Sequence, residues 1–223
     1  KMYKLFYMPM CAAGRAAKII LYEKKIVFDS INEPIWQRRI DFLKINPEGD
    51  LPVIIDDQNI KIVGYFSLAY YLDETNVGLN LIGDNALDRL EVRRLCRWLS
   101  NKFYKEVMDN IVEERVFKSL KGLGNPSSEC LKAGRVNLKN HENYFEWLLK
   151  DRTFLAGEFF SLADIVYSAY MSTLDYLSEV SWERIGYTKK WYAKIKSRPS
   201  FKDILKEKLF TIPASKHYQD LDF

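Results

Sequence analysis

The chain has 223 residues, of which 48% are hydrophobic and 29% are charged, with only 10 Gly and 7 Pro. This length and composition are typical of a globular protein with one large or two small domains, and they exclude disordered, collagen-like and low-complexity classes. The net charge of +4, from 34 Lys and Arg against 30 Asp and Glu, is spread along the chain and too mild for a dedicated nucleic-acid binder.

The first 75 residues alternate short strands with helices. We expect strands at 3–8, 26–28, 51–55 and 60–63, the last two forming a hairpin around the turn Asp56-Asp57-Gln58-Asn59. Helical composition predicts helices at 12–23, 34–43 and 66–74, the second with Pro34 in its first turn. The resulting order, βαβ–α–ββα, predicts an α/β domain over residues 2–75.

The rest of the chain is predicted to be helical. From about Asp84 apolar residues recur every three to five positions, which indicates long helices at 84–113 and 128–150. Ser161 and Asp164 form a start that resembles a capping box, and it opens an apolar helix through Leu177. Shorter helices are expected at 188–197 and 200–208. We therefore predict a linker at 76–83, an all-helical domain at 84–208 and a C-terminal tail at 209–223.

Cysteines and histidines are few and scattered. They are Cys11, Cys96, Cys130, His141 and His217. This pattern argues against a disulfide scaffold and against a zinc site. The start has no apolar secretory segment, and the longest weakly charged run, 159–174, is shorter than the ~20 residues that span a bilayer. We expect a cytoplasmic protein with no metal, membrane or nucleic-acid partner.

Three motifs in this sequence resemble those of glutathione transferases. The first is Asn46-Pro47-Glu48-Gly49-Asp50-Leu51-Pro52-Val53-Ile54, which is similar to the family signature N-P-x-G-x-V-P-V-L. The others are the segment 154–165 and the segment from Trp191 to the Arg198-Pro199-Ser200-Phe201 turn. The resemblance covers residues 2 to about 208. It implies a thioredoxin-like N-terminal domain and an all-helical C-terminal domain.

The resemblance also implies where glutathione would bind and react. In the family, the residue before a cis-proline offers its backbone to the cysteinyl part of glutathione, and here these residues are Leu51 and Pro52. The family's catalytic Tyr, Ser or Cys corresponds to Tyr7 or Cys11 in this sequence. Because Cys11 precedes a helix, we expect the helix N-terminus to lower the pKa of its thiol. The alternative is that Leu51-Pro52, Tyr7 and Cys11 serve only the packing of the domain.

One departure from the family pattern weakens the glutathione site. Glutathione transferases open the helix after the last strand with Glu or Gln followed by Ser, where this chain has Gly64 and Tyr65. We expect the phenol of Tyr65 to occupy the space of the ligand. Each lost hydrogen bond to a charged group is worth about 1.5–3 kcal/mol, so binding should fall roughly a hundredfold or more. We therefore expect no cofactor, and glutathione only if the chain is an enzyme.

The tail resembles a narrower group within the family. The ending Pro213-Ala214-Ser215-Lys216-His217-Tyr218-Gln219-Asp220-Leu221-Asp222-Phe223 is similar to the C-terminus of the alphaproteobacterial FtsZ-localised protein A family, which also carries a Trp after its second strand, as Trp36 does here. The resemblance implies a homodimer that binds FtsZ filaments. It makes Trp36, Asp220, Leu221, Asp222 and Phe223 the candidate partner surface. A disordered end and a tail packed on the core are the alternatives.

Two functions follow from these observations. The first is a non-enzymatic, homodimeric protein of bacterial cell division that binds FtsZ at the division site. The second is a glutathione S-transferase that conjugates or reduces small electrophiles through Cys11 or Tyr7. For either function, the resemblance implies a dimer with the helices 84–113 and 128–150 near its axis.

Overall fold

The structure is a computed structural model that describes residues 2–75 and 78–222. Its N-terminal part is built on a four-stranded sheet in the order β2-β1-β3-β4. The strands are β1 (Tyr3–Tyr7), β2 (Phe28–Asn32), β3 (Val53–Ile55) and β4 (Lys61–Val63). β2 runs parallel to β1, whereas β3 is antiparallel to both β1 and β4.

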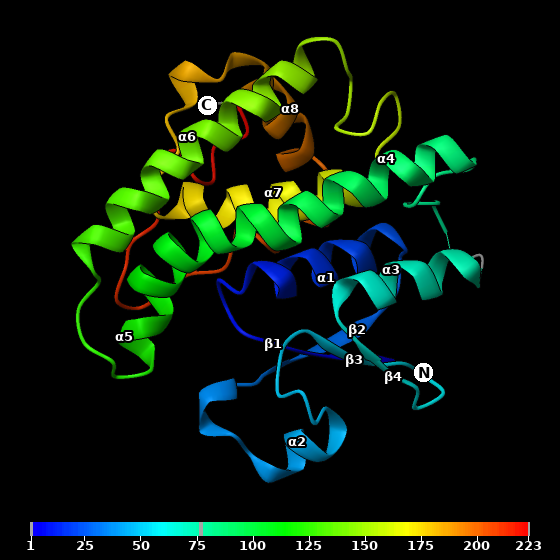
Figure 1. The fold of residues 1–223 in the computed structure, drawn as a ribbon. Helices are drawn as coiled ribbons and strands as arrows, with labels where there is room; N and C mark the ends of the chain where they lie inside the picture. Colours follow the sequence, from blue (N-terminus) through cyan, green and yellow to red (C-terminus); the bar gives the residue numbers. More distant parts are fainter. Residues whose placement is uncertain (1, 76–77, 223) are drawn as a thin grey trace.

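Helices cover both faces of this sheet (Figure 1). α1 (Ala12–Glu23) and α3 (Tyr65–Glu74) lie between the sheet and the C-terminal helices, and α2 (Ile40–Ile45) lies on the opposite face. Apolar side chains of the central strands are buried between these layers. The predicted thioredoxin-like domain is therefore confirmed, with the helix at 12–23 in its predicted place.

One edge of the sheet differs from the prediction. β2 starts at Phe28 and continues through Asp29 and Ser30, because an edge strand tolerates polar side chains that hide it from an apolar pattern. The continuous helix expected at 34–43 is wrong. Arg38 takes the left-handed conformation (φ 47°), which a right-handed helix cannot contain. The segment therefore splits into the 3-10 turn η1 (Ile35–Gln37) and α2.

Two long helical rods form the outer side of the C-terminal domain. α4 (Ala86–Arg97) continues into the π-helical stretch η2 (Trp98–Phe117) and then α5 (Lys118–Leu120), and α6 (Ser128–Lys150) returns antiparallel to them (Figure 1). The rods approach closely at Gly134, where a Cβ would lie 2.7 Å from Ile111 Cγ1. The helix predicted at 128–150 is confirmed, and the one predicted at 84–113 extends further than expected.

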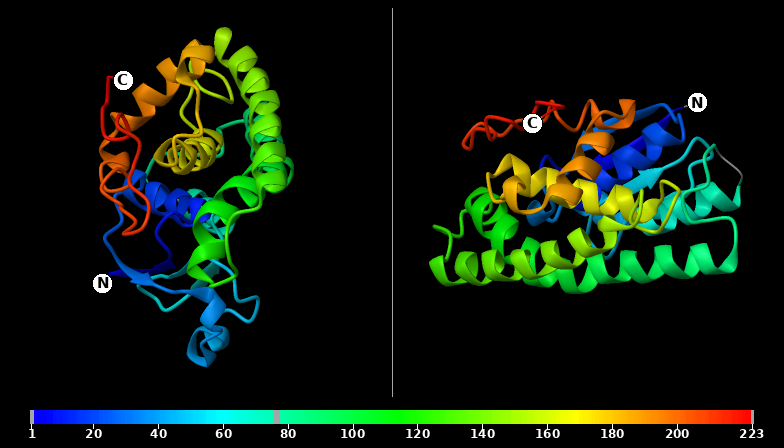
Figure 2. Two further views of the ribbon diagram at one scale, coloured as in Figure 1. Left: turned by 90° about the vertical axis from the view of Figure 1, so that its left-hand side faces the viewer. Right: turned by 90° about the horizontal axis from the view of Figure 1, so that it is seen from above.

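α7 (Leu162–Tyr176) is the central helix of this domain and is buried along its whole length (Figure 2). The predicted capping box is present, with Asp164 Oδ2 accepting from Ser161 N at 2.9 Å. The other oxygen, Oδ1, accepts from Leu155 N at 2.9 Å and Trp191 Nε1 at 2.8 Å. Burial raises the pKa of this carboxyl, and its four donors compensate for the lost solvent.

The chain then returns toward the N-terminal domain. η3 (Trp182–Arg184) leads into α8 (Gly186–Lys196) and the short turn η4 (Pro199–Phe201). The helix predicted at 200–208 is wrong, since the chain continues from η4 in turns. Ion pairs attach this region to α1: Glu207 binds Lys18 at 2.7 Å, and Arg198 binds Glu23 at 2.7 Å.

The C-terminal segment packs against the protein instead of extending into solvent. Tyr218 is 1% exposed, and its hydroxyl donates to Ile204 O at 3.1 Å. Ser215 N donates to Tyr176 O at 3.0 Å, and His217 Nε2 lies 2.7 Å from Asp175 Oδ1. Disorder of the tail, one of the three alternatives, is thus wrong for residues 209–222.

Asp73 secures the crossing between the two domains. Its Oδ2 accepts hydrogen bonds from Leu81 N and Ile82 N, both at 2.9 Å. Residues 76–77 of the predicted linker 76–83, like Phe223 of the tail, lie outside the described residues. In the part of the chain that is described, no helix combines the length and apolar character needed to cross a membrane.

Candidate functional site

The turn before β3 has the backbone shape that the glutathione-transferase resemblance implies. The Leu51–Pro52 peptide bond is cis, and Pro52 O accepts from Gly64 N at 2.9 Å, which ties the turn to the start of α3. However, Leu51 N already donates to Asp50 Oδ1 at 2.8 Å. The backbone donor that the resemblance assigns to glutathione is therefore engaged within the protein.

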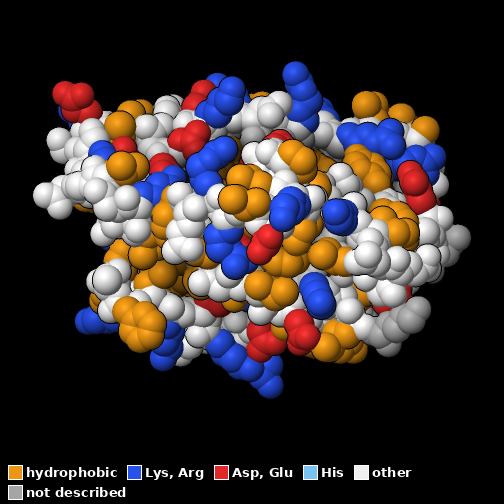
Figure 3. Space-filling model, turned by 90° about the horizontal axis from the view of Figure 1, so that it is seen from below, with side chains coloured by type: hydrophobic (Ala, Val, Ile, Leu, Met, Phe, Trp, Pro, Cys, Tyr) orange, Lys and Arg blue, Asp and Glu red, His pale blue; other side chains and the backbone are white. Residues whose placement is uncertain are grey.

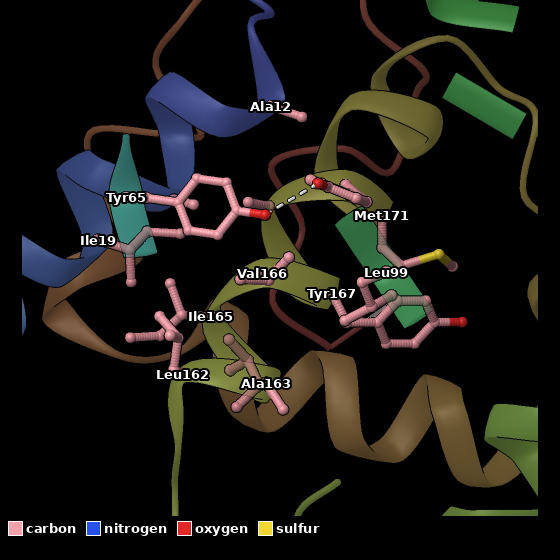
Figure 4. Packing of buried hydrophobic residues seen from close by; sticks show 14 of the residues in the cluster. Ala12, Ile19, Tyr65, Leu99, Leu162, Ala163, Ile165, Val166, Tyr167 and Met171 are labelled. Atoms are coloured by element: carbon pink, nitrogen blue, oxygen red, sulfur yellow. Dashed lines mark hydrogen bonds between the residues drawn. The ribbon is translucent and has the colours of Figure 1, made fainter. Parts of the chain in front are cut away.

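Gly64 and Tyr65 stand where the family has its acidic and hydroxyl residues. Gly64 has φ +81°, a conformation that glycine adopts freely and that would strain a glutamate. Tyr65 is buried, and its ring points from α3 toward α7, where its hydroxyl lies 3.3 Å from that of Tyr170 (Figure 4). Our expectation that the phenol fills the ligand's space is wrong, because the ring belongs to the core between the domains.

Cys11 sits at the N-cap of α1, in the position expected of a reactive thiol. Burial nevertheless raises the pKa of its thiol to about 11, which outweighs the hydrogen bonds from the backbone of Gly14 and Ala13. The predicted lowering of this pKa is wrong for that reason. At neutral pH the side chain is a protonated thiol, which is a poor nucleophile.

Side chains from η2 leave little space beside the half-buried Cys11. Tyr104, Met108 and Phe117 are among those that line a cavity of about 20 Å³ next to the thiol. That volume accommodates little more than one water molecule. The cavity itself is too small for a tripeptide.

Tyr7, the other catalytic candidate, lies close to Cys11 across Gly14. A Cβ on Gly14 would be 3.1 Å from the Tyr7 Cβ and 3.6 Å from the Cys11 Cβ. Lys18 Nζ lies 3.6 Å from the centroid of the Tyr7 ring, and the same ammonium binds Glu207. This half-buried ring is therefore held between the core and a paired lysine, and its surroundings are those of a packing residue.

A larger apolar cavity of about 290 Å³ opens beside Trp36. Its wall combines residues that follow β1, the ends of β2 and η2, η1, α5 and the start of the C-terminal segment. They are Met8, Pro9, Asn32, Pro34, Trp36, Phe117, Leu120, Lys208, Leu209, Phe210 and Thr211. Figure 3 shows the underside of the molecule, where α2 and the sheet lie, with hydrophobic side chains across the middle of the face and Lys and Arg among them.

The elements around Trp36 fix its position. Glu33 N donates to Tyr7 O at 2.9 Å, and Arg39 Nη2 donates to the buried Glu33 carboxylate at 2.7 Å, so both ends of η1 are anchored. The sequence analysis identified Trp36 but missed Phe210, which is fully exposed at the rim of the cavity. The apolar pair Leu209-Phe210, directly after the predicted last helix, was the sequence feature that could have identified Phe210.

The tail candidates lie elsewhere. Asp220, Leu221 and Asp222 are exposed, and Leu221 lines a separate cavity beside α8. The C-terminus is at the opposite end of the molecule from α2 and η1 in Figures 1 and 2, so the structure does not bring Trp36 and these residues together. Tyr218 points into the core. Within the described residues, no group of three or more Cys, His, Asp or Glu side chains could hold a metal ion.

Comparison with known proteins connects both halves of the chain to one family. Residues 5–78 match the family model described as glutathione S-transferase, N-terminal domain, and residues 107–199 match glutathione S-transferase, C-terminal domain. FtsZ-localized protein A of Caulobacter vibrioides is 34% identical over 98% of this chain and 97% of the relative.

Solved structures agree with this over the whole length. The structure titled FzlA from C. crescentus has a TM-score of 0.96 at 34% identity, and a glutathione S-transferase from Rhodospirillum rubrum has a TM-score of 0.95 at 36% identity. Each comparison covers 100% of both chains. The chain therefore belongs to the glutathione S-transferase family, in the group that includes FtsZ-localized protein A.

Proposed function

We propose that this protein is a binding protein of bacterial cell division that associates with FtsZ and does not use glutathione. The observation that carries the proposal is the closed thiol site. The cavity beside Cys11 has a volume of about 20 Å³, and the pKa of the thiol is raised to about 11. A chain of this family that lacks a working thiol site needs another role, and the relative at 34% identity is named for its localisation with FtsZ.

The cavity beside Trp36 is the first candidate contact for FtsZ. It is apolar, it has a volume of about 290 Å³, and the half-buried indole is held in place by the anchored η1 turn. A rigid aromatic beside a pocket is a common arrangement at the centre of binding interfaces, where a partner inserts an apolar side chain. Asp220, Leu221 and Asp222 form a second candidate contact at the other end of the molecule.

Co-sedimentation with FtsZ polymers tests both contacts. Trp36→Ala should weaken association by about 2 kcal/mol or more, which is roughly thirtyfold in the dissociation constant. Asp222→Lys, or removal of residues 221–223, should also abolish co-sedimentation. Tyr187→Ala is the matched control, because Tyr187 is an exposed aromatic in the first turn of α8, whereas Leu221 lies beside Lys196 at the other end of that helix. The proposal fails if the Trp36 and Asp222 variants sediment with FtsZ as the parent does.

In our proposal the protein is a homodimer whose two chains contact each other through α4 and α6. Leu87 and Leu90 on α4 and Trp147 on α6 are 76%, 62% and 65% exposed, which is a large apolar area to leave in water. Tyr144 stacks on Trp98 at 4.6 Å and extends the aromatic surface toward Trp147. Light scattering should report twice the 26.3 kDa chain mass, and Leu87→Glu with Leu90→Glu should reduce it to one chain. A single-chain mass for the parent at micromolar concentration would contradict the dimer.

The alternative is a glutathione S-transferase that acts on small electrophiles, as the name of the 36% identical Rhodospirillum rubrum protein suggests for that relative. Titration calorimetry with glutathione separates the two functions. Our proposal predicts little heat at millimolar glutathione. A dissociation constant at or below about 100 μM, or about −5.5 kcal/mol, would return the protein to the enzyme class.

A further inference from the structure

The positive charge of the chain is concentrated in one region. Residues 186–216 contain nine Lys and Arg but only two Asp and Glu, a net charge of +7, which leaves −3 for the rest of a chain with +4. The charge is therefore less evenly spread than the total suggests. This region comprises α8, η4 and the first part of the C-terminal segment, which lie beside one another in Figure 2.

A groove of about 530 Å³ runs through this basic region. Its volume is in the range of clefts that bind ligands. The lining residues come from α8, η4, the turns after η4 and the C-terminal segment. They are Lys196, Ser197, Arg198, Pro199, Lys202, Leu205, Lys206, Gln219 and Leu221.

The wall of the groove is fixed by internal contacts. The buried Lys196 Nζ donates to His217 O at 3.2 Å and also to Asp220 O, which holds the C-terminal segment against α8. Gln219 Nε2 donates to Leu205 O at 3.0 Å. Arg198 is paired with Glu23 through two hydrogen bonds of 2.7 and 2.8 Å. The groove is thus a built feature of the fold, and no rearrangement is needed to form it.

Two of its cations face solvent. Lys202 is exposed and makes no ion pair with any residue in the described part of the chain. Lys206 pairs with Asp203 at 2.7 Å, but its side chain is 61% exposed, so water screens this pair. The groove also presents two apolar side chains, Pro199 and the half-exposed Leu221.

We propose that this groove docks an extended acidic peptide segment of a partner protein. Carboxylates of the peptide would pair with Lys202 and Lys206, while an apolar side chain between them would pack on Leu221 and Pro199. Charge complementarity of this kind steers association and selects the partner. The groove is a different surface from the Trp36 cavity, although it shares Leu221 with the second candidate contact for FtsZ. The proposal does not depend on FtsZ being the partner.

The chemistry of the groove favours a peptide over a nucleic acid. A nucleic acid carries a phosphate at every step, and its backbone would meet Asp203, Asp220 and Asp222 around the groove. A peptide can place its carboxylates only where the lysines are. Leu221 and Pro199 add an apolar contact that suits an amino-acid side chain.

Fluorescence anisotropy with the full chain tests the proposal without FtsZ. The probe is a labelled peptide that alternates Asp or Glu with Leu or Phe. Two comparison peptides replace either its acidic residues by Lys or its apolar residues by Ser. We expect the acidic apolar peptide to bind, the other two to bind at least roughly tenfold more weakly, and binding to weaken as salt rises.

Charge-reversal variants locate the site. Lys202→Glu with Lys206→Glu should weaken binding of the acidic apolar peptide at least roughly tenfold. Lys61→Glu with Lys132→Glu changes the net charge equally at exposed positions on β4 and α6, and it should leave binding within about twofold. Leu221→Ala, which leaves all charges in place, should weaken binding of the acidic apolar peptide but not of its serine version.

Three results would overturn the proposal. One is equal weakening by the two charge-reversal pairs, since binding would then follow net charge alone. Another is an unchanged affinity in the Lys202 and Lys206 variant whose circular dichroism matches the parent. The third is tighter binding of a single-stranded oligonucleotide than of the acidic peptide through the same two lysines, which would make the groove a nucleic-acid site.

Discussion

Two cavities share Phe117 in their walls, and their volumes differ more than tenfold. On one side, the cavity beside Cys11 has about 20 Å³ and is closed by Tyr104 and Met108. On the other, the cavity beside Trp36 has about 290 Å³ and opens to the surface. The bond before Pro52 is nevertheless cis, as the resemblance to glutathione transferases implies.

Under our proposal, a family fold has lost one function while it keeps its architecture. A small-molecule site depends on a few side chains, and closing it requires only larger neighbours and a missing carboxylate. The fold depends on the sheet, the capping box at Asp164 and the buried α7, all of which are intact. Function therefore follows the site, and the fold alone does not determine it.

Replacing Phe117, which lines both cavities, should have the largest effect on the difference between them. In the parent, Cys11 should react with a disulfide reagent at neutral pH roughly a hundredfold or more slowly than an ordinary cysteine, because its pKa is about 11. Phe117→Ala joins the two cavities and should raise this rate at least roughly tenfold through solvent access. Mass spectrometry of the Cys11 peptide measures the rate, and Cys11→Ala provides the background.

The pH dependence of the same reaction sharpens this prediction. Burial raises the pKa of Cys11, so the protonated thiol dominates until the pH approaches 11. The rate should therefore rise about tenfold per pH unit between pH 7 and 10 without levelling. A plateau below pH 8 would show a thiolate stabilised by the helix N-terminus, and the closed-site interpretation would be lost.

Substitutions of Tyr65 test whether the start of α3 can be returned to the sequence found in glutathione transferases. Tyr65→Ser restores the family's hydroxyl but empties a buried aromatic position between α3 and α7, which should cost about 3 kcal/mol of unfolding free energy. Tyr65→Phe, the control, loses only the contact with the Tyr170 hydroxyl and should cost about 1 kcal/mol. Urea denaturation measures both. Glutathione binding at micromolar affinity in the serine variant would mean that one residue had kept the site from functioning.

Much of the fold could be predicted from local patterns. The helices at 12–23 and 128–150 begin and end where composition and apolar periodicity placed them, and the Ser161–Asp164 start is a capping box as predicted. Local signals failed where backbone conformation or an edge position decided the outcome. Arg38 adopts a left-handed conformation that could not be predicted from its residue type. β2 contains polar residues because it lies at the edge of the sheet.

The state of the candidate site was harder to predict, because it depends on contacts between distant parts of the chain. The missing Glu-Ser pair was visible at Gly64 and Tyr65, but the residues that close the cavity at Cys11 lie about ninety to a hundred positions away in η2. The apolar periodicity of that helix does not indicate which of its faces covers the Cys11 thiol. Tyr218 shows the same difficulty, because an aromatic in a polar tail could face a partner or the core, and here it is buried.

Substitutions of His217 in the tail should have the smallest of these effects. They test whether the second candidate contact, Asp220, Leu221 and Asp222, is held in place before a partner binds. His217 Nε2 lies 2.7 Å from Asp175 Oδ1, which also accepts from Trp182 Nε1 at 2.8 Å. His217→Ala leaves the buried carboxylate with fewer partners and should cost about 1–2 kcal/mol in thermal unfolding. His217→Gln, which keeps a donor, should cost less.

The alanine variant should also be cut faster by protease within 209–222, because the segment that carries Asp220 and Leu221 is released from Asp175. Equal cleavage rates for parent and alanine variant would show that Tyr218 and Lys196 hold the segment without His217, and Tyr218→Ala would then be the change that frees it.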